Sequence, residues 1–301
     1  MDSVQPGPSV QQMVELDSAI NWMASLGVDV DPARQAGYRK IVQTWRDAAQ
    51  GRSKLGVREL APMIATWAYE VAAFVAVHRA FGAAPRASLT GLAERLGRAM
   101  RGPIRIDGAR SAAPDPARDA LFEALTAACL QQVASQGKVV HGAGGVMDLV
   151  HGRHQVGVRC ERLVAHGGIA TSLAAAGTRL APALDAGQGA RRRGLVALDA
   201  SALLKPADRL PQAGTAVDME RAADQQLTDF VDAQMAAIQA GLQALDRRII
   251  GSLVLFSTVA LTQDGRDVFQ VGRWALVWRD QISFGDADLL GRMRDGLRGG
   301  A

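Results

Sequence analysis

The sequence predicts an α/β fold in two parts, an all-helical N-terminal part and a mixed α/β part after it. In the first hundred residues, apolar side chains recur every three or four positions, which is typical of helices buried along one side. From about residue 138 onward, short alternating or continuous apolar runs are typical of strands. The stretch between them, residues 102–116, is rich in Gly, Pro and Ala. We therefore predict domains at 1–108 and 109–301.

The N-terminal part is expected to be a bundle of helices. Apolar periodicity predicts helices at 14–26, 32–49, 60–81 and 89–100. Asp31 followed by Pro32 favours the start of the second helix, because aspartate caps a helix and proline fits its first turn. The third helix is the most apolar stretch, but charged residues interrupt it, which favours a buried helix over a membrane span. We expect no membrane partner, and a helical part that binds a protein partner, forms a homodimer or clamps nucleic acid.

The second part is expected to alternate helices and strands. Periodicity predicts helices at 119–136, 169–184, 217–245 and 287–297, and strands at 138–141, 193–199, 249–261 and 268–278. A turn at Asp264–Gly265 is expected to join the last two strands.

The most informative segment is a predicted hairpin of Val146–Val150 and Val156–Leu163. Side chains two positions apart on a strand share a face, so Arg159 and Glu161 point the same way. If residues 152 and 153 form a two-residue turn, Asp148 lies opposite residue 157 and joins that face. A three-residue loop would put Asp148 on the other face.

This hairpin resembles the core of the PD-(D/E)XK nuclease superfamily, whose fold is called restriction-endonuclease-like. The family carries an acid on one strand and acid-x-Lys on the next. Here Asp148 matches the first acid, while Arg159 and Glu161 have the acid and the base exchanged. The surrounding elements extend the resemblance over roughly residues 119–204, and residues 20–45 and 251–278 are similar to parts of a bacterial branch of the superfamily. The resemblance implies a three-layer α/β/α domain that follows the helical domain in the sequence.

For function, the resemblance implies metal-dependent phosphodiester hydrolysis with Mg²⁺ or Mn²⁺. Asp148, the backbone carbonyl of Cys160 and Glu123 match metal-binding positions, whereas Arg159 replaces the second acid and Glu161 the lysine. A guanidinium there competes with a cation, which favours lost catalysis. Glu161 nevertheless keeps one acid on this face, so a shifted cation held by Asp148, Glu161 and Glu123 stays open. A purely structural ion pair between Asp148 and Arg159 is the third interpretation.

The basic residues are mostly arginines, with only four lysines among 34, and the net charge is +4. This charge is compatible with a nucleic-acid partner and equally with plain solubility. The arginines expected beside the hairpin are Arg153, Arg162, Arg191, Arg192 and Arg193. The two cysteines form no CxxC pair, and the first residues do not resemble a signal peptide, so we expect a cytoplasmic protein with reduced thiols.

Three functions therefore stay open on sequence. The first is a nuclease that acts on DNA or RNA. The second is an inactive descendant that works as a nucleic-acid-binding or regulatory subunit, and the third is an interaction protein whose helical half binds the partner. A zinc site made from the histidines near Cys160 is disfavoured, because their spacing matches no familiar module. The sequence also lacks the glycine-rich phosphate loops and the GxSxG elbow.

Overall fold

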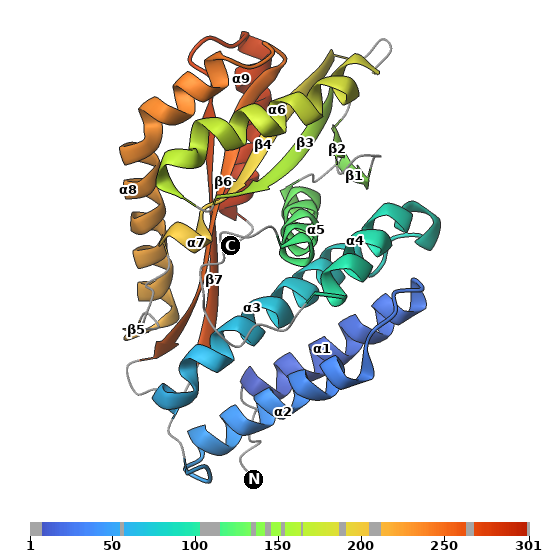
Figure 1. The fold of residues 1–301 in the computed structure, drawn as a ribbon, viewed down its shortest axis with the longest axis vertical. Helices are drawn as coiled ribbons and strands as arrows, with labels where there is room; N and C mark the ends of the chain where they lie inside the picture. The colour runs from blue at the N-terminus through green and yellow to red at the C-terminus, as the bar shows by residue number, and fades with distance from the viewer. Residues whose placement is uncertain are drawn as a thin grey trace.

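The structure is a computed structural model, and it describes residues 8–54, 57–102, 115–133, 137–141, 146–151, 154–163, 165–186, 191–204, 212–262 and 268–299. Within these ranges the predicted α/β class is confirmed: N-terminal helices precede a mixed sheet on which further helices pack (Figure 1). None of the described helices is both long and apolar enough to cross a membrane.

All the helices predicted in the N-terminal part are present. They are α1 (Pro8–Ser25), α2 (Pro32–Ala49), α3 (Val57–Phe81) and α4 (Thr90–Met100), with a short 3-10 turn η1 (Arg86–Ser88) before the last. The Asp31 carboxylate accepts a hydrogen bond of 2.9 Å from the Ala33 amide, with Pro32 in the first turn, so the predicted cap of α2 is confirmed. A buried triad joins α2 to α3, because Glu70 on α3 accepts hydrogen bonds from both Arg34 and Tyr38 on α2.

The second part also follows the predicted order. Its helices are α5 (Pro116–Val133), α6 (Ile169–Asp185), α7 (Ser201–Leu204), α8 (Ala216–Gln243) and α9 (Phe284–Gly299), with the 3-10 turn η3 (His166–Gly168). Its strands are β1 (Gly137–His141), β2 (Val146–His151), β3 (His154–Arg162), β4 (Arg191–Asp199), β5 (Gln212–Ala213), β6 (Ile249–Thr262) and β7 (Val268–Trp278). The short elements η1, η3, α7 and β5 were not predicted. The expected turn at Asp264–Gly265 lies outside the described residues.

The sheet joins an antiparallel half to a parallel centre. Its order is β1-β2-β3-β4-β6, and both β5 and β7 also pair with β6. The strands β1, β2 and β3 form an antiparallel meander, whereas β3, β4 and β6 run parallel. Parallel strands begin at the same edge of a sheet, so the residues that precede β4 and β6 meet there.

Helices cover both faces of the sheet, and each face has its own hydrophobic cluster. On β4, Leu195 and Ala197 belong to one cluster with α1 to α5 and α9, while Val196 and Leu198 belong to the other with α6 and α8 (Figure 1). A strand buried on both sides needs a continuous apolar run, which explains the sequence of β4.

The first cluster crosses the predicted domain boundary. It joins Leu16 and Phe74 of the N-terminal helices to Val158 of β3 in one continuous set of contacts. Residues 103–114, where the boundary was predicted, lie outside the described residues, and the division at 108 stays a prediction. The N-terminal helices and the sheet therefore share one hydrophobic core.

Candidate functional site

The register of the hairpin is the one that a two-residue turn requires. Asp148 on β2 lies opposite Gly157 on β3, so it shares a face with Arg159 and Glu161, as predicted. Arg159 lies beside Val196 of β4, which belongs to the cluster beneath α6 and α8. The predicted acids and the arginine thus face the layer of α6.

The ion pair of Asp148 is formed with Arg192 on β4. Asp148 Oδ1 accepts a hydrogen bond of 2.6 Å from Arg192 Nη2, and both side chains are largely buried. Gly157 lies on the strand between them, and a Cβ there would be 3.6 Å from Asp148 Oδ1 and 3.1 Å from Leu180 Cδ1 on α6. The glycine leaves room for the pair to form across β3. The ion pair expected between Asp148 and Arg159 is therefore wrong, because the partner of Asp148 is Arg192.

The other predicted charges, Glu123, Arg159 and Glu161, lie in a line of alternating sign with two arginines that were not predicted. We name this line the charge chain, and it consists of Arg95, Glu123, Arg159, Glu161 and Arg179. Its successive ion pairs measure 2.8 Å, 3.8 Å, 3.7 Å and 2.7 Å between nitrogen and oxygen. Exposure of the side chains rises along it from 2% at Arg95 to 50% at Arg179. Each glutamate thus lies between two guanidinium groups.

The charge chain passes from one face of the sheet to the other. Glu123 is on α5, which packs on the first face, while Arg179 is on α6 on the second face. Arg159, which lies opposite Val146 at the start of β2, joins the two sides because it pairs with both Glu123 and Glu161. Burial raises the pKa of Glu161, and the neighbouring Arg179 and Arg159 oppose this rise.

Cys160 lies on the opposite face from Arg159 and Glu161, as predicted, and its thiol is buried in the first cluster. Burial raises the pKa of the Cys160 thiol, and burial likewise raises the pKa of Cys129 to about 12. Both thiols are therefore protonated at neutral pH, which makes them poor nucleophiles and poor metal ligands.

These residues do not fit the divalent cation that the resemblance implies. A magnesium or manganese ion requires several oxygen atoms within about 2.0–2.6 Å, with net negative charge around it. Here each of the three carboxylates is already ion-paired with arginine. Asp148 lies opposite Gly157, four positions before Glu161, which corresponds to about 13 Å along the strand. In the part of the chain that the structure describes, no group of three His, Cys, Asp or Glu side chains could hold a metal ion.

The arginines predicted to contact phosphate are largely occupied. Arg162 pairs with Asp119 on α5, Arg192 with Asp148, and Arg193 with Asp286 on α9. Arg153 lies outside the described residues, and for Arg191 only the backbone, opposite His154, is described. Three of the five predicted contacts would therefore have to exchange an aspartate for a phosphate.

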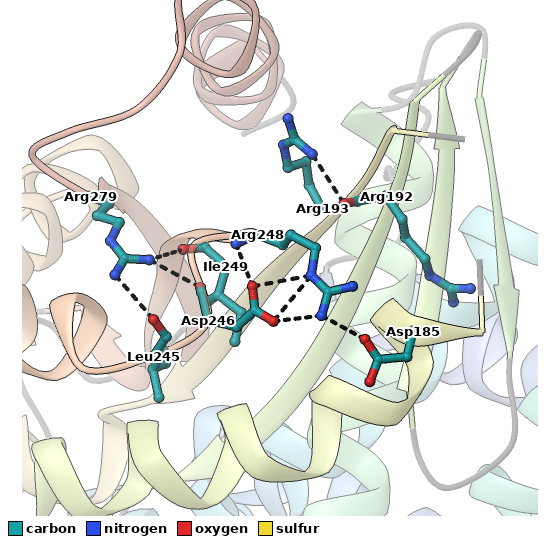
Figure 2. Close-up of polar contacts among 8 residues, drawn as sticks. All are labelled: Asp185, Arg192, Arg193, Leu245, Asp246, Arg248, Ile249 and Arg279. Atoms are coloured by element: carbon teal, nitrogen blue, oxygen red, sulfur yellow. Dashed lines mark hydrogen bonds and ion pairs between the residues drawn. The ribbon is translucent and has the colours of Figure 1, made fainter. Parts of the chain in front are cut away.

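A larger arginine cluster, not predicted as a unit, lies where β4 and β6 begin and β7 ends (Figure 2). We name it the arginine edge, and it consists of Arg192, Arg193, Arg248 and Arg279, which Figure 2 labels, and of Arg247, whose charge acts on Arg279. Arg248 donates hydrogen bonds of 2.6 Å to Asp246 and 2.7 Å to Asp185, which together raise its pKa. Arg247 is exposed. The Arg247–Arg248 pair between a predicted helix and a predicted strand was the sequence signal for this cluster.

Arg279 has a structural role in the arginine edge. Its buried guanidinium donates to the carbonyl oxygen of Gln243, the last residue of α8, at 2.9 Å. It also donates to the carbonyl oxygens of Leu245 at 3.1 Å and Asp246 at 3.0 Å, which follow α8 (Figure 2). A cation at this end of a helix satisfies free carbonyls and complements the helix dipole. Burial lowers the pKa of Arg279, and the neighbouring Arg247 adds to this effect.

Comparison of this chain with models of protein families, with characterised proteins and with solved structures finds no match.

Proposed function

We propose that this protein binds nucleic acid through a nuclease-like fold without cleaving it by a metal-dependent reaction. The charge chain is the observation that carries the proposal. At the positions where the family would gather carboxylates around a cation, each glutamate here lies between two arginines. A guanidinium group cannot lower the pKa of a water as a bound cation does, but it binds phosphate oxygens well.

The order of elements supports the nuclease-like part of the proposal. The resemblance implies a helix, a hairpin, a second helix and a further strand, and the chain has α5, β2–β3, α6 and β4 in that order. Arg247, the exposed member of the arginine edge, and the half-exposed Arg179 support the binding part, since accessible arginines provide planar donors for phosphate. The metal-dependent nuclease remains the alternative, and the residues described here favour it less.

A fluorescence anisotropy titration with labelled DNA and RNA, at several salt concentrations, tests the proposal. We expect equal affinity in EDTA and in Mg²⁺, with a log–log salt slope of roughly −0.9 per phosphate contact on duplex DNA. Gel analysis of the same samples should show intact strands. Cleavage in Mg²⁺ or Mn²⁺ that Asp148→Ala abolishes would overturn the inactive assignment, and no binding at low salt would overturn the proposal as a whole.

A matched pair of variants locates the interface. Arg247→Gln removes an exposed charge from the arginine edge, and Arg39→Gln removes an exposed charge from α2, far from it in the chain. Both change the net charge by the same amount. We expect Arg247→Gln to weaken binding and to reduce the salt slope by about one contact, and Arg39→Gln to change neither. Equal effects of the two variants would place the interface elsewhere.

A further inference from the structure

The buried end of the charge chain has more positive charge than its carboxylates can satisfy. Glu123 carries one negative charge and divides it between Arg95 at 2.8 Å and Arg159 at 3.8 Å. Arg95 is the more deeply buried of the two, with 2% of its side chain exposed. A buried guanidinium that shares a carboxylate with a second arginine is costly, because little water can screen the remaining charge.

Arg95 also has an unused hydrogen-bond donor. Its Nε donates to Glu123 and its Nη1 donates to the Gly91 carbonyl at 2.9 Å. Its Nη2 is buried and has no hydrogen-bond partner among the residues that the structure describes. Buried donors in folded proteins nearly always have a partner, so a vacant donor on a buried cation indicates that something other than the chain accepts from it.

His141, at the end of β1, lies close enough to Arg95 to be affected by its charge, and its side chain also has unpaired polar atoms. Both of its ring nitrogens are buried, and within the described part of the chain neither has a hydrogen-bond partner. A Cβ built on Gly91 of α4 would lie 2.6 Å from the His141 Cβ and 3.4 Å from Arg95 Nη1, so the two residues are neighbours beside Gly91. Burial, together with the positive charge of Arg95, lowers the pKa of His141 to about 3. An anion placed between the two side chains would offset the charge of Arg95 and so raise the pKa of His141.

We infer that Arg95 and His141 form a binding site for a small tetrahedral oxyanion of the phosphate class. The unused Nη2 of Arg95 and the ring N–H of His141 would donate to its oxygens, and Arg159, 3.8 Å from Glu123, would offset the negative charge of that carboxylate. The depth of Arg95 favours a free ion, fully withdrawn from water, over a phosphate held in a polymer. This inference does not depend on nucleic-acid binding, because it rests on α4, α5 and β1 rather than on the arginine edge.

Isothermal titration calorimetry with inorganic phosphate, at fixed ionic strength set with sodium chloride, tests the site directly. We expect one phosphate bound per chain and a rise in melting temperature that chloride does not produce. His141→Phe keeps a ring of similar size and removes both unpaired nitrogens, so it should fold at least as well as the wild type. It should weaken phosphate binding by about tenfold or more, since a hydrogen bond to a charged group is lost.

Two further variants keep the test decisive. Arg95→Lys retains the charge that Glu123 requires and removes the planar fork, and we expect it to lose most of the phosphate affinity. His78→Phe makes the same exchange at a partly buried histidine on α3 and should leave the affinity unchanged. Phosphate that stabilises no more than chloride does, or an unchanged affinity in His141→Phe, would overturn the site, and a bridging water would then explain the vacant donors.

A short single strand with and without a 5′-phosphate distinguishes the source of the anion. We expect the two strands to bind alike, and excess inorganic phosphate to leave their affinity unchanged at fixed ionic strength. A preference for the phosphorylated strand that disappears in His141→Phe would assign the site to strand ends and overturn the free-ion assignment.

Discussion

Replacing Glu123 by glutamine separates the two interpretations of the hairpin by the sign of a stability change. In a cation site without its metal, carboxylates repel one another, and removing one charge stabilises the fold. In the charge chain the same substitution removes the carboxylate that pairs with the buried Arg95 at 2.8 Å and with Arg159 at 3.8 Å. Glutamine keeps the shape of the side chain and one acceptor oxygen, so the change isolates the charge.

The expected size follows from the burial of these groups. Breaking a buried ion pair by removing one partner costs about 3–5 kcal/mol, and both Arg95 and Glu123 are nearly inaccessible to solvent. We therefore expect Glu123→Gln to lower the free energy of unfolding by about 3 kcal/mol, a large share of the ~5–15 kcal/mol typical of a folded protein.

Urea unfolding followed by circular dichroism measures this change, provided that the wild type and the variant have the same m-value. Glu94→Gln is the matched control, because Glu94 lies on the same helix as Arg95 and is exposed. It should change stability by less than about 0.5 kcal/mol. A Glu123→Gln variant as stable as the wild type, or more stable, would refute the charge chain as a neutral network and would favour a vacant cation site.

Two other predictions concern packing and pH. Gly241→Ala on α8 would place a Cβ 2.5 Å from Leu173 Cδ1 on α6, so we expect a loss of about 1–3 kcal/mol despite the better helix propensity of alanine. Gly97→Ala on α4 meets nothing within 4 Å and should gain up to about 1 kcal/mol, and thermal unfolding of both variants checks the contrast. Because the pKa of His141 falls from 6.5 to about 3 on folding, its contribution to stability is complete above pH 6.5 and is lost as the pH falls toward 3. Between pH 6.5 and pH 5 in phosphate-free buffer, the wild type should lose about 2 kcal/mol more than His141→Phe, and equal losses in urea unfolding would contradict the buried neutral histidine.

Local signals in the sequence were sufficient for the elements and for the register of the hairpin. Apolar periodicity predicted the long helices, Asp31 and Pro32 predicted the start of α2, and a two-residue turn predicted that Asp148 lies opposite residue 157. These features depend on residues close together in the chain. The unpredicted elements α7 and β5 are four and two residues long, which is too short for a periodic pattern.

The partners of the charged residues could not be predicted, because they come from distant segments. Arg192 meets Asp148 only because β4 pairs with β3 and Gly157 leaves the intervening position free. Arg95 interrupts the apolar side of an amphipathic helix, which indicates a buried charge, but the sequence does not say which acid neutralises it. The arginine edge likewise requires the parallel order of β4 and β6.

The hydrophobic cluster that α1 to α5 share with the sheet affects how the chain can be divided. Without the N-terminal helices, Met147, Val158 and Leu195 would lose much of the layer that covers them, and a fragment containing only the sheet would expose an apolar face. Such a fragment is expected to aggregate when it is produced alone and to remain soluble when it is produced together with residues 1–102. The N-terminal helices are thus expected to keep the sheet soluble, because they permanently cover its apolar face.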